Sequence, residues 1–205
     1  MKLYYMGQTR ATRPRWLLEE IGADYDLVEL DDDRRDEWLP AYRQVHPLGR
    51  IPAFEDEGRI VIESSAICLH LADKFPEAGL APPPGSIDRA TYYQWAFYVM
   101  TEIEPPLDLV SMHEVELPPE ERVPAVLPWA RQRFHEAAGI ADRHLADRDH
   151  LLDGGFSAVD VMLVCMLAWA GRRDLLSPHA NLRRYAERLM ARPAARQAFA
   201  ADQPS

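Results

Sequence analysis

Residues 46–76 read HPLGRIPAFEDEGRIVIESSAICLHLADKFP, and this stretch decides the fold. Apolar residues at 53–54 and 60–62 flank the polar turn EDEGR, a pattern typical of a β-hairpin. Further on, Ile67, Leu71 and Phe75 recur every four positions, which predicts an amphipathic helix over residues 64–75. The stretch is therefore predicted to form a strand, a turn, a second strand and a helix.

A proline, Pro52, stands directly before the first of these strands. It has no N–H to donate to a sheet, and cis peptide bonds are almost confined to X–Pro pairs. With a cis Ile51–Pro52 bond, the backbone of Ile51 is free to pair with an extended peptide as an added strand. An ordinary loop proline is the competing interpretation, and the dipeptide alone does not decide between them.

Glu63, Ser64 and Ser65 lie where the second strand ends and the helix begins. The N-terminus of a helix has unpaired N–H groups and partial positive charge, so it binds carboxylates readily. Glu63 can pair with an ammonium group while Ser64 and the nearby N–H groups hold a carboxylate. Together they match the two ends of an α-amino acid. Simple N-capping by Ser64 or Ser65 is the alternative.

Strands and helices alternate upstream of this stretch. Residues 2–6 and 25–30 have the composition and alternation of strands, and residues 11–20 and 31–43 are helical. The predicted order is β-α-β-α-β-β-α. We expect an α/β domain over residues 1–78 and a proline-rich linker over 79–86.

An all-helical domain is expected over residues 87–205. Its first predicted helix, 87–112, is interrupted at Pro105-Pro106, because a proline inside a helix kinks or breaks it. The others cover residues 124–145, 157–171, 182–190 and 194–201. Ser157 and Asp160 have the spacing of a capping box at the start of the third helix.

The composition excludes several functions. A net charge of −10 argues against partners such as nucleic acid and anionic membranes. The longest apolar run, 161–170, is too short to span a bilayer, and the N-terminus has no apolar signal segment. Cys68 and Cys165 are isolated in apolar helical patterns, so we expect buried free thiols, a cytoplasmic location and no metal site.

Three stretches together resemble bacterial-type cytosolic glutathione transferases. They are residues 2–30 (KLYYMGQTRATRPRWLLEEIGADYDLVEL), 46–76, and 151–169 (LLDGGFSAVDVMLVCMLAW). In effect the resemblance covers the whole chain. It implies a thioredoxin-like glutathione-binding domain followed by the helical domain, glutathione as co-substrate, and a homodimer.

The resemblance also implies the roles of individual residues. Ile51 would pair its backbone with the cysteinyl residue of glutathione, and Pro52 would be the cis proline. Glu63 and Ser64 would bind the γ-glutamyl end, and Arg50 would lie near the glycyl carboxylate.

Thiol activation requires a hydrogen-bond donor in residues 5–13. Glutathione attacks as a thiolate, whereas an unperturbed thiol has a pKa of about 8.5. Members of the family with a Ser or Thr donor favour Thr9 here, and members with a Tyr donor favour Tyr5. Thr12 is the third candidate, or it caps the helix. No cysteine lies in this loop, which argues against thiol-exchange branches, and the Ser-Ser-Cys run of maleylacetoacetate isomerases is also missing.

The predicted function is therefore conjugation of glutathione to a hydrophobic electrophile. The alternative is a catalytically silent module of the same fold that binds ligands or proteins.

Overall fold

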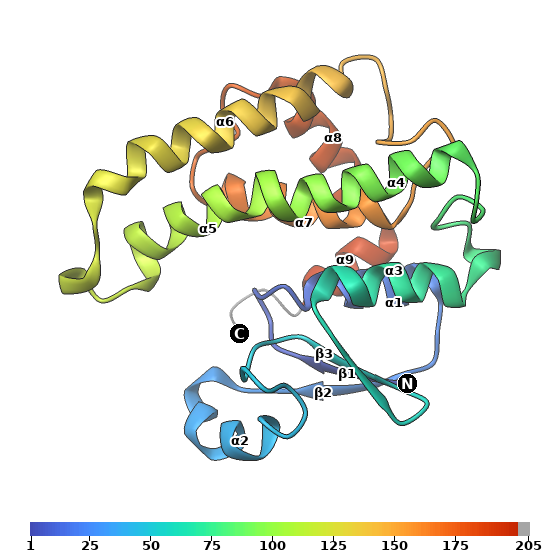
Figure 1. The fold of residues 1–205 in the computed structure, drawn as a ribbon, viewed down its shortest axis with the longest axis vertical. Helices are drawn as coiled ribbons and strands as arrows, with labels where there is room; N and C mark the ends of the chain where they lie inside the picture. The colour runs from blue at the N-terminus through green and yellow to red at the C-terminus, as the bar shows by residue number, and fades with distance from the viewer. Residues whose placement is uncertain (201–205) are drawn as a thin grey trace. The chain divides into compact units, whose positions relative to one another are not determined.

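A four-stranded mixed sheet organises the first part of the computed structural model, which describes residues 1–200 (Figure 1). The strands are β1 (Lys2–Tyr5), β2 (Asp26–Glu29), β3 (Ala53–Asp56) and β4 (Arg59–Ile62). Their order in the sheet is β2-β1-β3-β4. β1 is parallel to β2 and antiparallel to β3, and β3 and β4 form the predicted hairpin.

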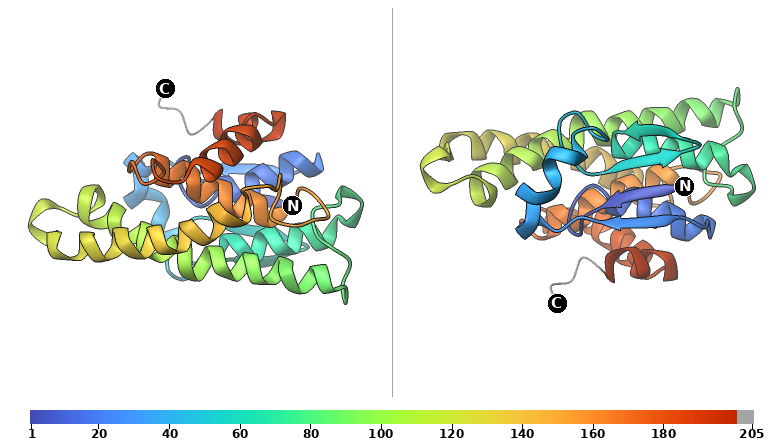
Figure 2. Two further views of the ribbon diagram at one scale, coloured as in Figure 1. Left: turned by 90° about the horizontal axis from the view of Figure 1, so that it is seen from above. Right: turned by 90° about the horizontal axis from the view of Figure 1, so that it is seen from below.

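Helices cover both faces of this sheet. α1 (Thr12–Ile21) and α3 (Ser64–Lys74) pack together on one face, and α2 (Arg35–Tyr42) lies on the other (Figures 1 and 2). Trp16 and Leu17 of α1 are completely buried, so this helix supplies much of the core. It ends at Gly22, whose left-handed conformation (φ 69°) favours glycine. The observed order confirms the predicted β-α-β-α-β-β-α arrangement.

The remainder is mostly helical. Its helices are α4 (Ile87–Tyr98), α5 (Glu104–Ser111), α6 (Leu127–His144), α7 (Ala158–Gly171) and α8 (Ala180–Met190), followed by α9 (Pro193–Ala200). α7 is buried along almost its whole length, with α4 and α8 packed against it. None of the helices in residues 1–200 is both long and apolar enough to cross a membrane.

The chain divides into two compact units, and the division differs at its end from the predicted one. Pro82–Met190 form the helical unit, whereas residues 191–200 group with Met1–Ala81. The reason is that α9 packs along α1, and the Phe199 ring meets the Trp16 ring edge-on at 5.9 Å. An amphipathic helix shows in its sequence that it has an apolar face, but not which element covers that face.

The predicted interruption before Pro105 takes the form of a π-helical turn. Val99–Ile103 join α4 to α5 in this conformation, and the Glu104 N–H bonds the Val99 carbonyl five residues back. Proline has no N–H, and its ring clashes with the carbonyl four residues earlier. The wider turn keeps the chain helical where a regular α-helix fails.

Ser157 and Asp160 form the predicted capping box at the start of α7. The buried Asp160 carboxylate accepts hydrogen bonds from the Ser157 N–H (2.8 Å), the Leu151 N–H (2.9 Å) and the Tyr185 hydroxyl (2.6 Å). Burial and this carboxylate together raise the pKa of Tyr185 well above its usual value. One carboxylate thus connects the loop before α7 to α8. Cys68 and Cys165 are both buried, as predicted, and neither forms a disulfide within the described residues.

Candidate functional site

Strand register brings three separate segments to one end of the sheet. Tyr4 of β1 lies opposite Ala53 of β3, and Ala53 lies opposite Ile62 of β4. Because both pairs are antiparallel, the loop after β1, the residues before β3 and the residues after β4 all leave the sheet at this end. Pro52 and Glu63 are therefore neighbours, and the loop that contains Thr9 lies next to them.

The segment before β3 is held by backbone geometry. The Ile51–Pro52 peptide bond is cis, as predicted. Within residues 1–200, no strand pairs with Ile51, so its backbone lies beyond the ladder of β3. The Tyr42 hydroxyl donates to the Arg50 carbonyl at 2.9 Å. Gly49 has φ 62°, a left-handed conformation that favours glycine, and a Cβ there would come within 2.5 Å of the Leu39 Cδ1 atom. The loop is thus anchored on α2.

Glu63 is the N-cap of α3 and has an unusual backbone (φ 71°, ψ 110°). Positive φ is costly for a residue with a Cβ, and such strain concentrates at functional sites. The Glu63 side chain is exposed. The alternative of serine capping is wrong, because α3 has no side-chain cap and Ser64 is already its first residue.

Ser64 instead contacts a buried cation. The Arg13 guanidinium, 0% exposed, donates from Nη1 to Ser64 Oγ at 2.8 Å. The Ser65 Oγ is buried and forms no hydrogen bond within the described residues. The start of α3 therefore presents a serine positioned by a guanidinium, and beside it a second hydroxyl with unused hydrogen-bonding capacity.

The pKa of His46 depends on the charged groups around this end of the sheet. Its ring is buried, and its Nδ1 accepts a hydrogen bond from the Leu48 N–H at 3.3 Å. Burial is the main cause that lowers the pKa of His46, the Glu63 carboxylate opposes it, and Arg50 adds to it. Glu63 and Arg50 are thus close enough to influence the same imidazole. The site therefore has one acidic and one basic exposed side chain in the neighbourhood of His46.

The three candidate thiol activators differ in their surroundings. The half-buried Thr9 hydroxyl donates to the Met6 carbonyl at 2.7 Å and accepts from the Ala11 N–H at 3.2 Å. Tyr5 is only 2% exposed, and the Arg15 guanidinium lies 4.6 Å from its ring centre. Thr12 is buried as the first residue of α1 and is not its cap, which is Ala11. Of the three, Thr9 is the most accessible.

Two contributors were not recognised from the sequence. Arg13 contacts Ser64, and both Glu63 and Arg50 act on the His46 ring, yet the sequence predicted a role for neither Arg13 nor His46. Their signals were weak, because an arginine one residue into a helix and a histidine before a proline are both common. No cluster of His, Cys, Asp or Glu suitable for a metal ion occurs among residues 1–200.

Comparison with known proteins identifies relatives over both units. Residues 1–73 match the family model described as the glutathione S-transferase N-terminal domain, and residues 84–188 match that of the C-terminal domain. Among curated proteins, maleylacetoacetate isomerase of Pseudomonas aeruginosa is 31% identical, with 100% of this chain and 98% of the relative covered. Glutathione S-transferase 3 of Schizosaccharomyces pombe is 27% identical, with 95% and 84% covered.

Solved structures show the same fold. A sphingomonad glutathione S-transferase complexed with glutathione superposes with a TM-score of 0.86 at 28% identity, and 98% of each chain is covered. A ternary complex of BphK, described as a bacterial GST, superposes with a TM-score of 0.87 at 28% identity, with 98% of this chain and 99% of the BphK chain covered.

Proposed function

The chain belongs to the glutathione S-transferase family, and from this premise we propose that it transfers glutathione to a hydrophobic electrophile at the end of the sheet described above. The observation that carries the proposal is the register that places Ile51–Pro52 beside Glu63 and Ser64. A backbone edge, a carboxylate and a helix N-terminus then meet at one end of the sheet, which suits an extended peptide with a zwitterionic end.

In the proposed binding mode, each of these groups contacts one part of glutathione. The backbone of Ile51, exposed by the cis bond to Pro52, pairs with the cysteinyl residue of glutathione. Glu63 accepts from the γ-glutamyl ammonium group, and Ser64 with the first N–H groups of α3 holds the γ-glutamyl carboxylate. Arg50, exposed on the neighbouring loop, pairs with the glycyl carboxylate.

For the activating group we propose Thr9. Its oxygen is fixed by the Ala11 N–H, so only the hydroxyl hydrogen needs to turn from the Met6 carbonyl toward sulfur. A hydrogen bond to the thiolate favours the charged form and lowers the thiol pKa. The thiolate then forms a carbon–sulfur bond to the electrophile, the leaving group departs with its electron pair, and the thiol proton goes to solvent.

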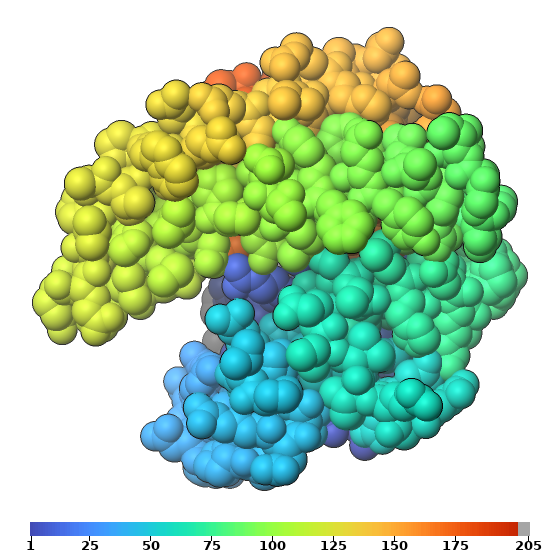
Figure 3. Space-filling model, viewed as in Figure 1, coloured from blue at the N-terminus to red at the C-terminus, as the bar shows by residue number. Residues whose placement is uncertain are grey.

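We also propose that the protein is a cytoplasmic homodimer. α4 lies on the surface of the helical unit (Figure 3), where Phe97 is 64% and Tyr93 is 41% exposed. These side chains are one helical turn apart, so they share one face. Adjacent exposed aromatic side chains of this size favour an interface over bare solvent contact.

Direct conjugation tests the function. The purified chain is mixed with glutathione and 1-chloro-2,4-dinitrobenzene, and product absorbance is followed against a reaction without protein. Glu63→Ala is the site variant, and Glu29→Gln, an exposed residue of β2, is the control. We expect turnover that is lowered in Glu63→Ala and unchanged in Glu29→Gln. Glutathione binding by calorimetry without turnover on any of several electrophiles would instead favour the silent binding module.

A further inference from the structure

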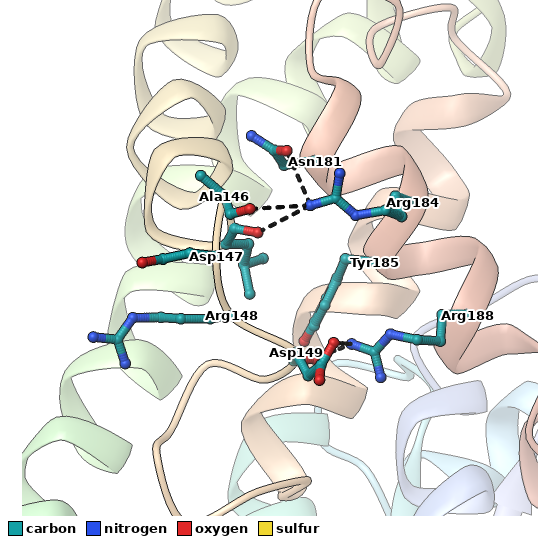
Figure 4. A pocket seen from close by; sticks show the side chains of 9 residues that line it. Ala146, Asp147, Arg148, Asp149, Asn181, Arg184, Tyr185 and Arg188 are labelled. Atoms are coloured by element: carbon teal, nitrogen blue, oxygen red, sulfur yellow. Dashed lines mark hydrogen bonds and ion pairs between the residues drawn. The ribbon is translucent and has the colours of Figure 1, made fainter.

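A polar pocket of about 160 Å³ lies within the helical unit, between residues 145–149 after α6 and one face of α8 (Figure 4). We call it the α8 pocket. All of the residues that line it belong to the helical unit, so it is separate from the proposed glutathione site. Arg184 and Arg188 extend from α8 toward the loop, and Tyr185 lies between them (Figure 4).

Each of the two arginines is held in place through one of its own nitrogen atoms, Nη2. Arg184 Nη2 contacts the carbonyl oxygens of Leu145 (3.4 Å) and Ala146 (3.3 Å) and the Asn181 Oδ1 (3.1 Å). Arg188 Nη2 donates to the Asp149 carbonyl oxygen. The loop carbonyls thus fix the two guanidinium groups, which reduces the conformational entropy that a ligand must remove.

The rest of each guanidinium retains its capacity to donate. Arginine has five N–H donors in a planar fork. Within residues 1–200, the Nε and Nη1 atoms of Arg184 and Arg188 form no hydrogen bond. The two residues are four positions apart on one helix, so their forks share a face. Such forks match the oxygens of carboxylates and phosphates in pairs.

Charge selects the kind of ligand. The Asp149 carboxylate lies 3.8 Å from Arg188 Nη2 and offsets one positive charge. Asp147 and Arg148 point away from the pocket in Figure 4, and Arg148 pairs with Asp153. Tyr185 donates its hydroxyl to Asp160, so it contributes only its ring. The groups that face the pocket thus carry one excess positive charge, in a chain whose net charge is −10.

We propose that the α8 pocket binds a small oxyanion, a carboxylate or phosphate group with one net negative charge. At about 30 Å³ for each water in the liquid, the volume corresponds to roughly five waters, which leaves room for a phosphate or acetate ion together with some of its hydration water.

Calorimetry tests the site. Inorganic phosphate and, in a separate arm, acetate are titrated into protein saturated with glutathione, so that the glutathione site is occupied. We expect binding of at least one ion, with at least tenfold loss of affinity in Arg184→Gln and in Arg188→Gln. Arg172→Gln makes the same charge change at another exposed position of the helical unit and should bind like the wild type.

Arg188→Lys separates fork recognition from charge alone. It keeps the charge but not the fork, so we expect affinity between those of the wild type and Arg188→Gln, with an unchanged circular dichroism spectrum. Binding of phosphate alone or acetate alone identifies the oxyanion. No binding of either ion, or equal loss in the Arg172 control, would overturn the proposal.

Discussion

Arg192 donates two hydrogen bonds to Glu20, a residue 172 positions earlier in the chain. The distances are 2.6 Å from Nε to Oε1 and 2.7 Å from Nη2 to Oε2. Trp16 Nε1 adds a third bond to the same carboxylate at 2.8 Å. Glu20 therefore fixes the segment before α9 to α1, and both belong to the same unit.

Replacing Glu20 with Gln should destabilise the fold by about 2 kcal/mol, because hydrogen bonds to a charged group contribute more than neutral ones. Urea denaturation at pH 7 measures the change. Glu187→Gln, at an exposed position on α8, is the matched control and should have little effect. Equal stability of both variants would show that the pair contributes nothing.

The same carboxylate predicts an acid dependence. Burial alone raises the pKa of Glu20, but the bonds from Arg192 and Trp16 outweigh it and hold the pKa below 4.5. The unfolded state therefore binds the proton more tightly, and this part of the stability is lost as pH falls below about 4.5 toward the folded pKa. In Glu20→Gln the decline over that range should be shallower.

Glu63 has two separable effects. Glu63→Ala and Glu63→Gly should each weaken glutathione binding by about 2 kcal/mol in calorimetry, since both lose the carboxylate. Only glycine relieves the positive φ, so Glu63→Gly should be more stable than Glu63→Ala by about 1 kcal/mol or more. A Glu63→Ala protein that is folded and binds with unchanged affinity would refute this placement of the site.

Thr9→Val removes the proposed donor with little change in shape. Turnover at neutral pH should fall about tenfold to a hundredfold, equivalent to about 1.4 to 2.8 kcal/mol, as the thiol pKa rises. Titration of thiolate absorbance against pH measures that pKa. Tyr5→Phe is the paired control. A raised pKa in Tyr5→Phe alone would transfer the role to Tyr5, and no shift in either would point to a backbone N–H.

Two histidines of the helical unit predict a second pH effect. His135 Nδ1 and His179 Nε2 are 3.1 Å apart. Burial lowers the pKa of both, Arg131 adds to the effect at His135, and His135 adds to it at His179. The unfolded chain therefore binds more protons below about pH 6.5, and stability falls as pH decreases from there.

His135→Gln removes one titrating group of this pair and should flatten the decline between pH 7.5 and 5.5. Urea denaturation at the two pH values measures it. His150→Gln changes a histidine outside the pair, so its profile should follow the wild type. A decline of the same steepness in His135→Gln would rule out the pair as its source.

Dimerisation is checked by light scattering. We expect twice the 23.4 kDa chain mass at micromolar concentration, and a shift toward monomer in Phe97→Asp because a charge would be buried in the interface. Glu187→Gln again serves as control. A wild-type monomer at that concentration would contradict the proposal.

The features that the sequence predicted correctly depend on residues that are close together in the chain. The hairpin, the Ile51–Pro52 bond and the Ser157–Asp160 box depend on residues close in the chain, where turn chemistry and capping determine the geometry.

What it did not predict depends on long-range packing. The bond from Arg13 to Ser64 spans 51 positions, and that from Arg192 to Glu20 spans 172. Arginine and glutamate are common in helices, so nothing in either helix marks its partner. The positive φ of Glu63 was also not predicted, because a residue with a Cβ rarely adopts it and nothing in the sequence marks the position.

The hydrogen bond from Arg13 to Ser64 affects how the Ser64 hydroxyl can contact a ligand. One lone pair of the serine oxygen accepts from a guanidinium, so the hydroxyl hydrogen is left to donate to a ligand, and the positive charge beside it strengthens that bond. A carboxylate accepts from such a hydroxyl with a negatively charged oxygen, whereas a primary amide in its place offers only a neutral one. In the proposed binding mode, the buried Arg13 thereby discriminates between a free γ-glutamyl carboxylate and its amide.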